Sequence, residues 1–199
     1  MDRIEDLARA FERFPGIGPR QARRFVYHLL NLPQGERTRV AELVSRLAEN
    51  VRQCPECMRY ANGGALVCSY CADPKRDDGI LMIVEKDQDL LAVERAGTYK
   101  GRYFVLGGVL TLSGKGVIRE KELVRVVQER IKKGAKEIVL ALSATSEGEH
   151  TTDRVRELLL PYRDGITISI LGRGLATGSE LEYADAETLS GALQNRKEA

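Results

Sequence analysis

The feature that most constrains the fold of this chain is an array of four cysteines near its middle. Cys54 and Cys57 form one C-x2-C pair, Cys68 and Cys71 form a second, and ten residues separate the two pairs. Each pair can present two thiolates to one small centre, as tetrahedral Zn²⁺ requires in structural sites. The spacing therefore predicts one zinc ion per chain, bound by these four residues.

Two other interpretations of the cysteines remain open at this point. Two disulfides would suit a secreted chain, but the segment from Met1 to Asp6 is charged and lacks the apolar core of a signal peptide. An iron–sulfur cluster is compatible with four thiolates, although nothing else in the sequence indicates one. No cysteine lies outside the array to act in catalysis. A short, loop-rich segment buries little apolar surface, so we expect its metal to be structural.

The N-terminal part of the chain reads as helices that are interrupted by a glycine-rich turn. Apolar residues recur at helical spacing from Ile4 to Phe11, from Ala22 to Leu29 and from Val40 to Val51. Between the first two segments lies Pro15-Gly16-Ile17-Gly18-Pro19, which no helix would tolerate. This pattern predicts two helices that are joined by a tight hairpin, followed by a third helix.

The turn has the composition of a phosphate-binding motif. Glycines let the backbone approach a phosphate closely, and the amides at the start of the next helix point toward an anion. Three arginines follow with no acidic residue among them, which suits binding of a nucleic-acid backbone without base reading. The motif resembles a helix-hairpin-helix; the alternative is a helix–helix turn with solvated arginines. The predicted DNA contacts are Gly16, Gly18, Arg20, Arg23 and Arg24.

From Gly79 onward the sequence alternates between buried strands and helices. Continuous apolar strands that are separated by helices predict a parallel sheet covered on both faces. A final helix is predicted over residues 184–196. The expected strands are residues 80–84, 103–106, 137–142 and 166–171, and the expected helices between them are residues 87–95, 121–133 and 151–160.

Acidic residues follow two of the predicted strands. Glu85 closes the first strand and Asp89 follows it, while Glu147 and Glu149 come after a later strand. Because parallel strands deliver side chains at their carboxyl ends, these carboxylates could converge on Mg²⁺, which prefers oxygen ligands. The pattern resembles the Toprim domain of topoisomerases and primases, although Glu-Gly-Glu stands where catalytic members usually carry Asp-x-Asp. The alternative is that these acids only cap helices or accept hydrogen bonds.

Composition limits the classes of partner. With 43% hydrophobic and 30% charged residues, the chain suits a compact globule with small appendages. Its net charge of +2 is too small to indicate a nucleic-acid partner by itself, so any basic patch must be local. The apolar run from Ile80 to Val84 is far too short to cross a bilayer. We therefore expect a cytoplasmic protein with no membrane partner.

The order of these parts resembles the RecR family over essentially the whole chain. Two departures occur: Ser143-Ala144 replaces the usual Asn-Pro, and His150 stands where a small residue is typical. Both lie beside the acidic pair, so they weaken the expectation of a metal there. The matching segments are residues 71–77, 83–85, 105–108, 145–149, 178–185 and 188–193.

This resemblance implies a recombination mediator of DNA repair that is not an enzyme and has no catalytic residue. Such proteins form ring-like oligomers, often homotetramers, that clamp DNA and act with RecO and RecF to help RecA replace single-strand-binding protein at gaps. The family's DNA-contacting positions fall on Arg20 and Arg24, and its zinc ligands on the four cysteines. The alternative function is a Mg²⁺-dependent nuclease or primase-like enzyme of the Toprim class. The family's acidic positions for partner or metal contacts fall on Glu85, Asp89, Glu147 and Glu149.

The expected fold class is α/β: a Toprim-like parallel-sheet domain with a helical N-terminal helix-hairpin-helix module and a small zinc finger. The expected domains are residues 1–53 for the helix-hairpin-helix module, 54–78 for the four-cysteine finger, 79–172 for the Toprim-like domain, and 173–199 for the C-terminal tail and helix.

Overall fold

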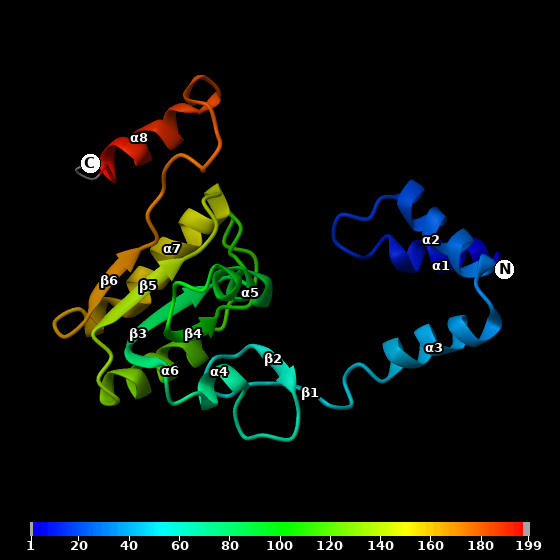
Figure 1. Cartoon of the computed structure of the whole chain (residues 1–199), viewed down its shortest axis with the longest axis horizontal. Coiled ribbons are helices and arrows are strands. Elements are labelled where there is room, and N and C mark those ends of the chain that lie inside the picture. The colour runs from blue at the N-terminus through cyan, green and yellow to red at the C-terminus, as the bar shows by residue number, and fades with distance from the viewer. Residues whose placement is uncertain (1, 197–199) are drawn as a thin grey trace. The chain divides into compact units, whose positions relative to one another are not determined.

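The computed structural model describes residues 2–196 (Figure 1). The chain divides into two compact units, with the division between Val51 and Arg52. The first unit is helical. It consists of α1 (Arg3–Phe11), α2 (Pro19–Asn31) and α3 (Gln34–Ser45).

The first two helices form a hairpin that is held by small buried residues. Asp2 caps α1, and its carboxylate accepts hydrogen bonds from the amides of Ile4 and Glu5. Ala8 of α1 packs against Ala22 and Val26 of α2, and all three side chains are buried. The two alanines let the helix backbones come close together, so this contact fixes the geometry of the turn between the helices.

The third helix is shorter than its apolar pattern predicts. The stripe from Val40 to Val51 indicated one continuous helix, whereas α3 ends at Ser45 and Val51 already belongs to strand β1 (Val51–Gln53). Leu43 and Val44 are 63% and 70% exposed. The prediction was wrong here because the apolar stripe has no core to pack against within this unit, and because Val51 opens the β1–β2 hairpin that carries the first cysteine pair.

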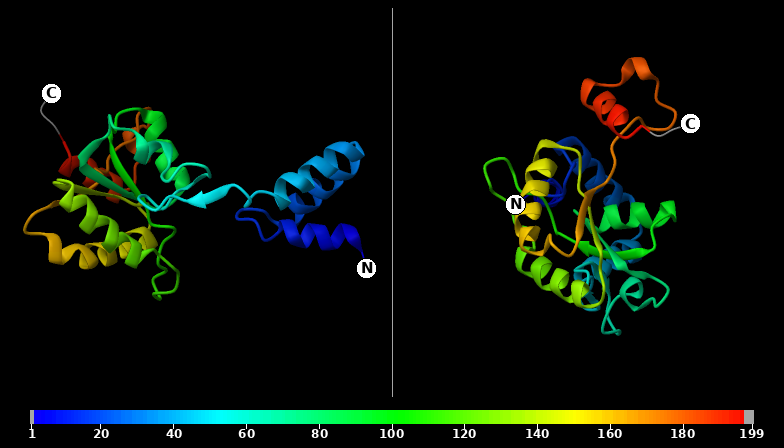
Figure 2. Two further views of the ribbon diagram at one scale, coloured as in Figure 1. Left: turned by 90° about the horizontal axis from the view of Figure 1, so that it is seen from below. Right: turned by 90° about the vertical axis from the view of Figure 1, so that its left-hand side faces the viewer.

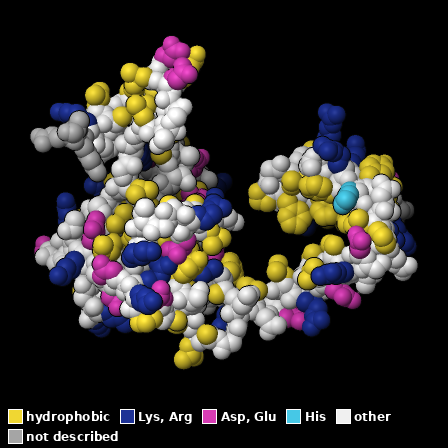
Figure 3. Space-filling model, in the orientation of Figure 1, with side chains coloured by type: hydrophobic (Ala, Val, Ile, Leu, Met, Phe, Trp, Pro, Cys, Tyr) yellow, Lys and Arg dark blue, Asp and Glu magenta, His cyan; other side chains and the backbone are white. Residues whose placement is uncertain are grey.

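An apolar groove of about 570 Å³ lies among the three helices. Leu7, Phe11, Leu30, Val40 and Val44 are among the residues that line it. Apolar side chains gather over this part of the molecule in Figure 3. The first unit therefore leaves a substantial apolar surface exposed to solvent.

The second unit combines the cysteine-bearing finger, an α/β domain and the C-terminal segment. Its first elements are β1 (Val51–Gln53), β2 (Tyr60–Asn62) and α4 (Ser69–Ala72). The α/β domain contains β3 (Asp77–Val84), α5 (Asp87–Ala96), β4 (Gly101–Val105), α6 (Glu120–Lys132), β5 (Glu137–Ala141), α7 (Ser146–Leu159), the 3-10 turn η1 (Leu160–Tyr162) and β6 (Thr167–Ile170). The C-terminal segment contains the 3-10 turn η2 (Leu181–Tyr183) and α8 (Ala186–Gln194).

The four long strands form a parallel sheet in the order β4-β3-β5-β6, which confirms the predicted fold class. Leu81 and Ile83 of β3 pack on α6 and α7, whereas Met82 and Val84 face α5. Helices therefore lie on both faces of the sheet, with α6 and α7 on one side and α5 on the other (Figure 2). None of the helices in residues 2–196 combines the length and apolar character needed to cross a bilayer.

Arginines of the α/β domain fasten the finger to the sheet. Arg102 donates hydrogen bonds to the carbonyls of Tyr70 and Cys71, at 3.2 and 3.0 Å. The buried Arg130 of α6 binds Glu56 of the finger at 2.6 Å and Asp78 of β3 at 3.0 Å. Both cysteine pairs are thereby held against the domain, and the finger is part of the second unit rather than a free module.

Replacing Arg130 with alanine is expected to lower the free energy of unfolding by about 2–3 kcal/mol, because two charge-assisted hydrogen bonds are lost. Urea unfolding that is followed by circular dichroism measures the change. Lys132→Ala removes an exposed charge from the same helix and should alter stability by less than about 0.5 kcal/mol. Equal stability of the two variants would contradict the fastening role of Arg130.

Candidate functional site

The four cysteines converge into one cluster. Their sulfur atoms all lie within 4.8 Å of one another, and Cys54, Cys57 and Cys68 are buried while Cys71 is half-buried. The Sγ atoms of Cys57 and Cys68 are 3.5 Å apart, close to the roughly 3.8 Å between ligands that bind Zn²⁺ tetrahedrally at about 2.3 Å. The donor set and its spacing therefore fit a four-cysteine metal site.

Backbone geometry prepares the cysteines for a metal. Cys68 is the N-cap residue of helix α4, and its amide donates a hydrogen bond to the Sγ of Cys54 at 3.4 Å. Hydrogen bonds from Cys57 and then Cys68 lower the pKa of the Cys54 thiol, because they stabilise its thiolate form. Met58 adopts a left-handed backbone with φ of 61°, and its amide donates to the carbonyl of Cys54. These contacts close the first pair into a tight knuckle.

The hairpin between α1 and α2 offers free backbone donors at its surface. Gly16 has a φ of 77°, a left-handed conformation that favours glycine. Gly18 precedes α2 in an extended conformation, and no side chain caps the helix there. Because Pro19 has no amide hydrogen, the amides of Arg20 and Gln21 are the helix donors left for an outside acceptor. The turn thus presents donors of the kind that bind an anion.

The three arginines that follow the turn are exposed, but they are not equivalent. Among the residues that the structure describes, Arg20 and Arg24 have no carboxylate partner, although Arg24 donates to the side-chain oxygen of Gln21 at 3.4 Å. Arg23 instead pairs with Glu5 of α1 at 3.3 Å. The expectation that all three are unopposed was wrong for Arg23, because the neighbouring helix supplies an acid that no local pattern reveals.

Glu85 is the most enclosed of the predicted acidic residues. It follows β3, is 3% exposed, and accepts hydrogen bonds from Ser143 at 2.7 Å and Lys86 at 2.5 Å. Burial raises its pKa, but the hydrogen bonds from Lys86 and Ser143 outweigh this effect and hold the pKa below its ordinary value. Glu85 is therefore a charged carboxylate that is neutralised by its own surroundings.

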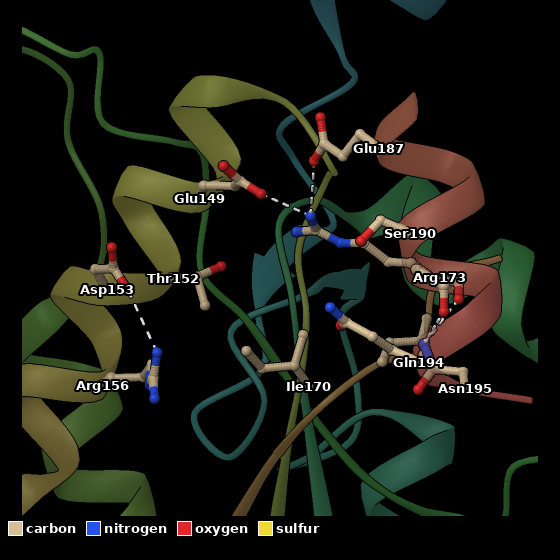
Figure 4. Close-up of a pocket in the computed structure, with 13 residues that line it drawn as sticks. Glu149, Thr152, Asp153, Arg156, Ile170, Arg173, Glu187, Ser190, Gln194 and Asn195 are labelled. Atoms are coloured by element: carbon tan, nitrogen blue, oxygen red, sulfur yellow. Dashed lines mark hydrogen bonds and ion pairs between the residues drawn. The ribbon is translucent and has the colours of Figure 1, made fainter. Parts of the chain in front are cut away.

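The other three acidic residues serve different local contacts. Asp89 accepts a hydrogen bond from the Lys86 amide at 2.8 Å and so caps α5. Glu147 and Glu149 lie in the first turn of α7 and are exposed. Glu149 binds Arg173 at 2.6 Å, and Arg173 also contacts Glu187 of α8 at 3.4 Å (Figure 4). Within residues 2–196, the cysteines are the only group of three or more metal-ligating side chains that come together.

Helix α7 starts five residues before its predicted start at Thr151, which explains the position of the acidic pair. Thr145 caps the helix by accepting a hydrogen bond from the amide of Gly148 at 3.1 Å. The first turn is polar and exposed, so it lacks the apolar repeat on which the prediction rested. The capping threonine followed by acids was the available signal. Nothing in the local sequence indicated Ser143 or Arg173 as partners of the acids.

Comparison with known proteins matches nearly the whole chain to one family. Residues 4–49 match the RecR helix-hairpin-helix, residues 79–172 the Toprim domain, and residues 174–197 the RecR C-terminal domain. Recombination protein RecR of Paracoccus denitrificans is 36% identical over 196 residues, covering 98% of this chain and 96% of the relative. Recombination protein RecR of Ruegeria sp. is 40% identical over 197 residues, with coverage of 98% and 96%.

The hairpin, the cysteine cluster and the parallel-sheet domain together define a recombination and repair protein of the helix-hairpin-helix and Toprim class. More particularly, the chain belongs to the RecR family, whose members are mediators of DNA recombination and repair. This membership confirms the resemblance that the sequence motifs indicated.

Replacing Cys54 with serine is expected to abolish stoichiometric zinc binding, because serine is a poor ligand and three thiolates leave the tetrahedron open. Loss of about 3 kcal/mol or more in the second unit should lower its melting temperature by roughly 6–12 °C. Metal analysis by mass spectrometry and calorimetry measure both effects. Freshly purified parent protein without zinc, or a variant that retains a full complement, would refute the assignment.

Proposed function

We propose that this chain binds DNA through the hairpin between α1 and α2. The observation that carries the proposal is that the fold itself does not require a glycine at position 18. A side chain there would meet no atom within 4 Å, and a φ of −89° suits any residue. A ligand that approaches the protein backbone closely would explain the glycine, because a side chain at this position would stand in its way. Arg20 and Arg24, which have no carboxylate partner within residues 2–196, supply the charge that a phosphate backbone needs.

Gly16 and Arg23 play smaller parts in this proposal. Gly16 shapes the turn through its left-handed backbone, while Arg23 would have to leave Glu5 in order to contact a phosphate. Because such an exposed pair is worth only about 0–1 kcal/mol, an approaching phosphate can displace Glu5. The site then comprises two ready guanidinium groups and one that is released on binding.

We further propose that several copies of the chain assemble into a ring-like clamp, a homotetramer, around DNA. One hairpin contacts few phosphates, so a single copy binds weakly, whereas linked copies add their contacts through effective concentration. The exposed apolar groove among α1, α2 and α3 supplies surface that self-association would bury. The clamp would act with RecO and RecF to help RecA replace single-strand-binding protein at gaps in the bacterial cytoplasm.

In this proposal the acidic residues and the metal have supporting roles. The exposed Glu147 is available to basic side chains of a partner protein, whereas Glu149 is paired with Arg173, and Glu85 and Asp89 are engaged elsewhere within the chain. The zinc ion is structural, since all four ligand positions are filled by cysteines and none is left for water or substrate. The protein therefore works by binding rather than by catalysis, with Mg²⁺ at most an occasional ligand of the acidic edge.

Replacing Arg20 and Arg24 together with alanine is expected to weaken binding of duplex DNA at low salt at least about tenfold, and to lower the slope of log K against log salt by about 2. Fluorescence anisotropy over a salt series measures both quantities. The pair Arg39→Ala and Arg46→Ala removes the same charge from α3 and from the residue that follows it, and should leave binding unchanged. Unaltered affinity of the first variant would rule out the hairpin as the DNA site.

Incubation of the protein with Mg²⁺ and DNA is expected to give neither cleavage nor extension. Gel electrophoresis of labelled single-stranded and duplex substrates, with nucleotides present in the extension assay, tests this expectation. Turnover that is lost in Glu85→Gln, while metal content and melting temperature stay the same, would instead support the nuclease or primase-like alternative.

A further inference from the structure

A second basic pocket lies in the other unit, where the finger meets the carboxyl ends of β3 and β4. Its volume is about 450 Å³. Arg59 and Tyr60 of the finger, Lys86 after β3, Gly107 after β4 and Arg119 before α6 are among its lining residues. Segments that are far apart in the sequence thus bring three cationic side chains to one cavity.

Two of these cations have no carboxylate partner among the residues that the structure describes. The Arg59 guanidinium stacks over the Tyr70 ring at 4.5 Å, and its buried Nε has no hydrogen-bond acceptor. Arg119 donates to the carbonyls of Met58 and Val105, at 3.1 and 2.8 Å. The Nε itself is shielded from solvent, so the terminal amino groups of the half-buried Arg59 guanidinium, for which the described residues supply no carboxylate, are the donors that can face an acceptor in the pocket.

Two acidic residues belong to the surroundings of the pocket: Asp87, which lines it, and Glu85, which precedes Lys86. The carboxylate of Asp87 accepts a hydrogen bond from the Tyr60 amide at 3.0 Å. Glu85 binds Ser143 as well as Lys86, whose side chain remains 58% exposed. Three cationic side chains and the single carboxylate of Asp87 line the cavity, so its lining carries a net positive charge, which favours an anionic ligand.

The backbone around the pocket is shaped to hold Arg119 in place. Gly107 has a φ of 95°, and a Cβ at this position would lie 2.9 Å from the Arg119 Cζ. The left-handed Met58 turns its carbonyl toward the same guanidinium. A guanidinium that is held in place in the lining of a cavity is a prearranged anion contact.

The exposed ring of Tyr60 indicates which class of anionic ligand suits the pocket. Tyr60 lines the pocket and is 55% exposed, and Leu91 beside it is 43% exposed. Exposed aromatic rings next to basic side chains bind single-stranded nucleic acid, since bases stack on the ring while phosphates contact the cations. Duplex DNA keeps its bases stacked inside and gains nothing from the ring.

We propose that this pocket binds one phosphate of single-stranded DNA through Arg59, Lys86 and Arg119, with the adjacent base stacked on Tyr60. The inference rests on the proposed DNA-binding function but uses a site in the other unit. It adds a preference for single strands that the hairpin alone, which contacts only backbone, does not provide.

The test uses the full chain and a fluorescein-labelled oligo(dT). Arg59→Ala is expected to weaken binding about five- to tenfold at low salt and to lower the salt slope by about 0.7. Tyr60→Ala is expected to weaken it about tenfold or more, whereas Tyr60→Phe retains most of the affinity. Arg52→Ala removes one exposed charge from the same finger outside the pocket and is the matched control. Metal content and melting temperature verify the fold of each variant, and Lys86→Ala replaces Arg59→Ala if the latter is unstable.

A direct readout comes from photocrosslinking with an oligo(dT) that carries 5-iododeoxyuridine. The crosslink is expected at Tyr60 when tryptic peptides are mapped by mass spectrometry, and Arg59→Ala should reduce its yield. Crosslinks that map only to the first unit, or equal affinities of Arg59→Ala and Arg52→Ala, would overturn the proposal.

The outcomes separate this inference from the proposed function. Loss of oligo(dT) binding in the Arg20 and Arg24 double variant, with the pocket variants unaffected, would leave the hairpin site standing and remove the pocket. Loss of oligo(dT) binding in the pocket variants alone would support the pocket and remove the hairpin as the DNA site. Competition by polyglutamate, combined with no effect of Tyr60→Ala, would assign the pocket to an acidic polypeptide and overturn the single-strand proposal.

Discussion

The arrangement of the second unit depends on the clustering of four sulfur atoms. The segment from Cys54 to Cys71 has almost no apolar core beyond the cysteines themselves, so only a bound metal can fix its backbone firmly. That backbone in turn supplies the carbonyls that Arg102 and Arg119 bind. Without a rigid cluster, these guanidinium groups would lose their acceptors in the finger, and the end of β4 would lose its hydrogen bond to Cys57. The metal site therefore organises the sheet edge next to it.

In the function proposed here, the two basic sites would each bind a different form of nucleic acid. The hairpin offers amides and guanidinium groups that would contact any phosphate backbone, which would give affinity without sequence preference. The pocket at the finger adds an aromatic surface that only unstacked bases can use. A mediator at a gap meets both duplex and single strand, so a chain with one site of each kind suits the junction between them.

The sequence predicted the fold class, the cysteine cluster and the hairpin, because each depends on local spacing. It missed the start of α7, whose polar first turn carries no apolar repeat, and the end of α3, whose exposed stripe resembles a buried one. It also missed the partners of the functional side chains. Glu5 beside Arg23, and Ser143 beside Glu85, come from distant parts of the chain, and no local pattern encodes such neighbours.

Arg119 touches the finger through Met58 and the sheet through Val105, and it does so in space that Gly107 leaves open. The residues at these four positions therefore depend on one another, because a change at one alters the contacts of the others. A finger taken from a distant relative would fit this sheet only if the residues at these four positions were exchanged together with it. The cysteine-bearing segment is thus poorly interchangeable, even though its ligand spacing looks modular, and changes at the four positions should accumulate together over evolution.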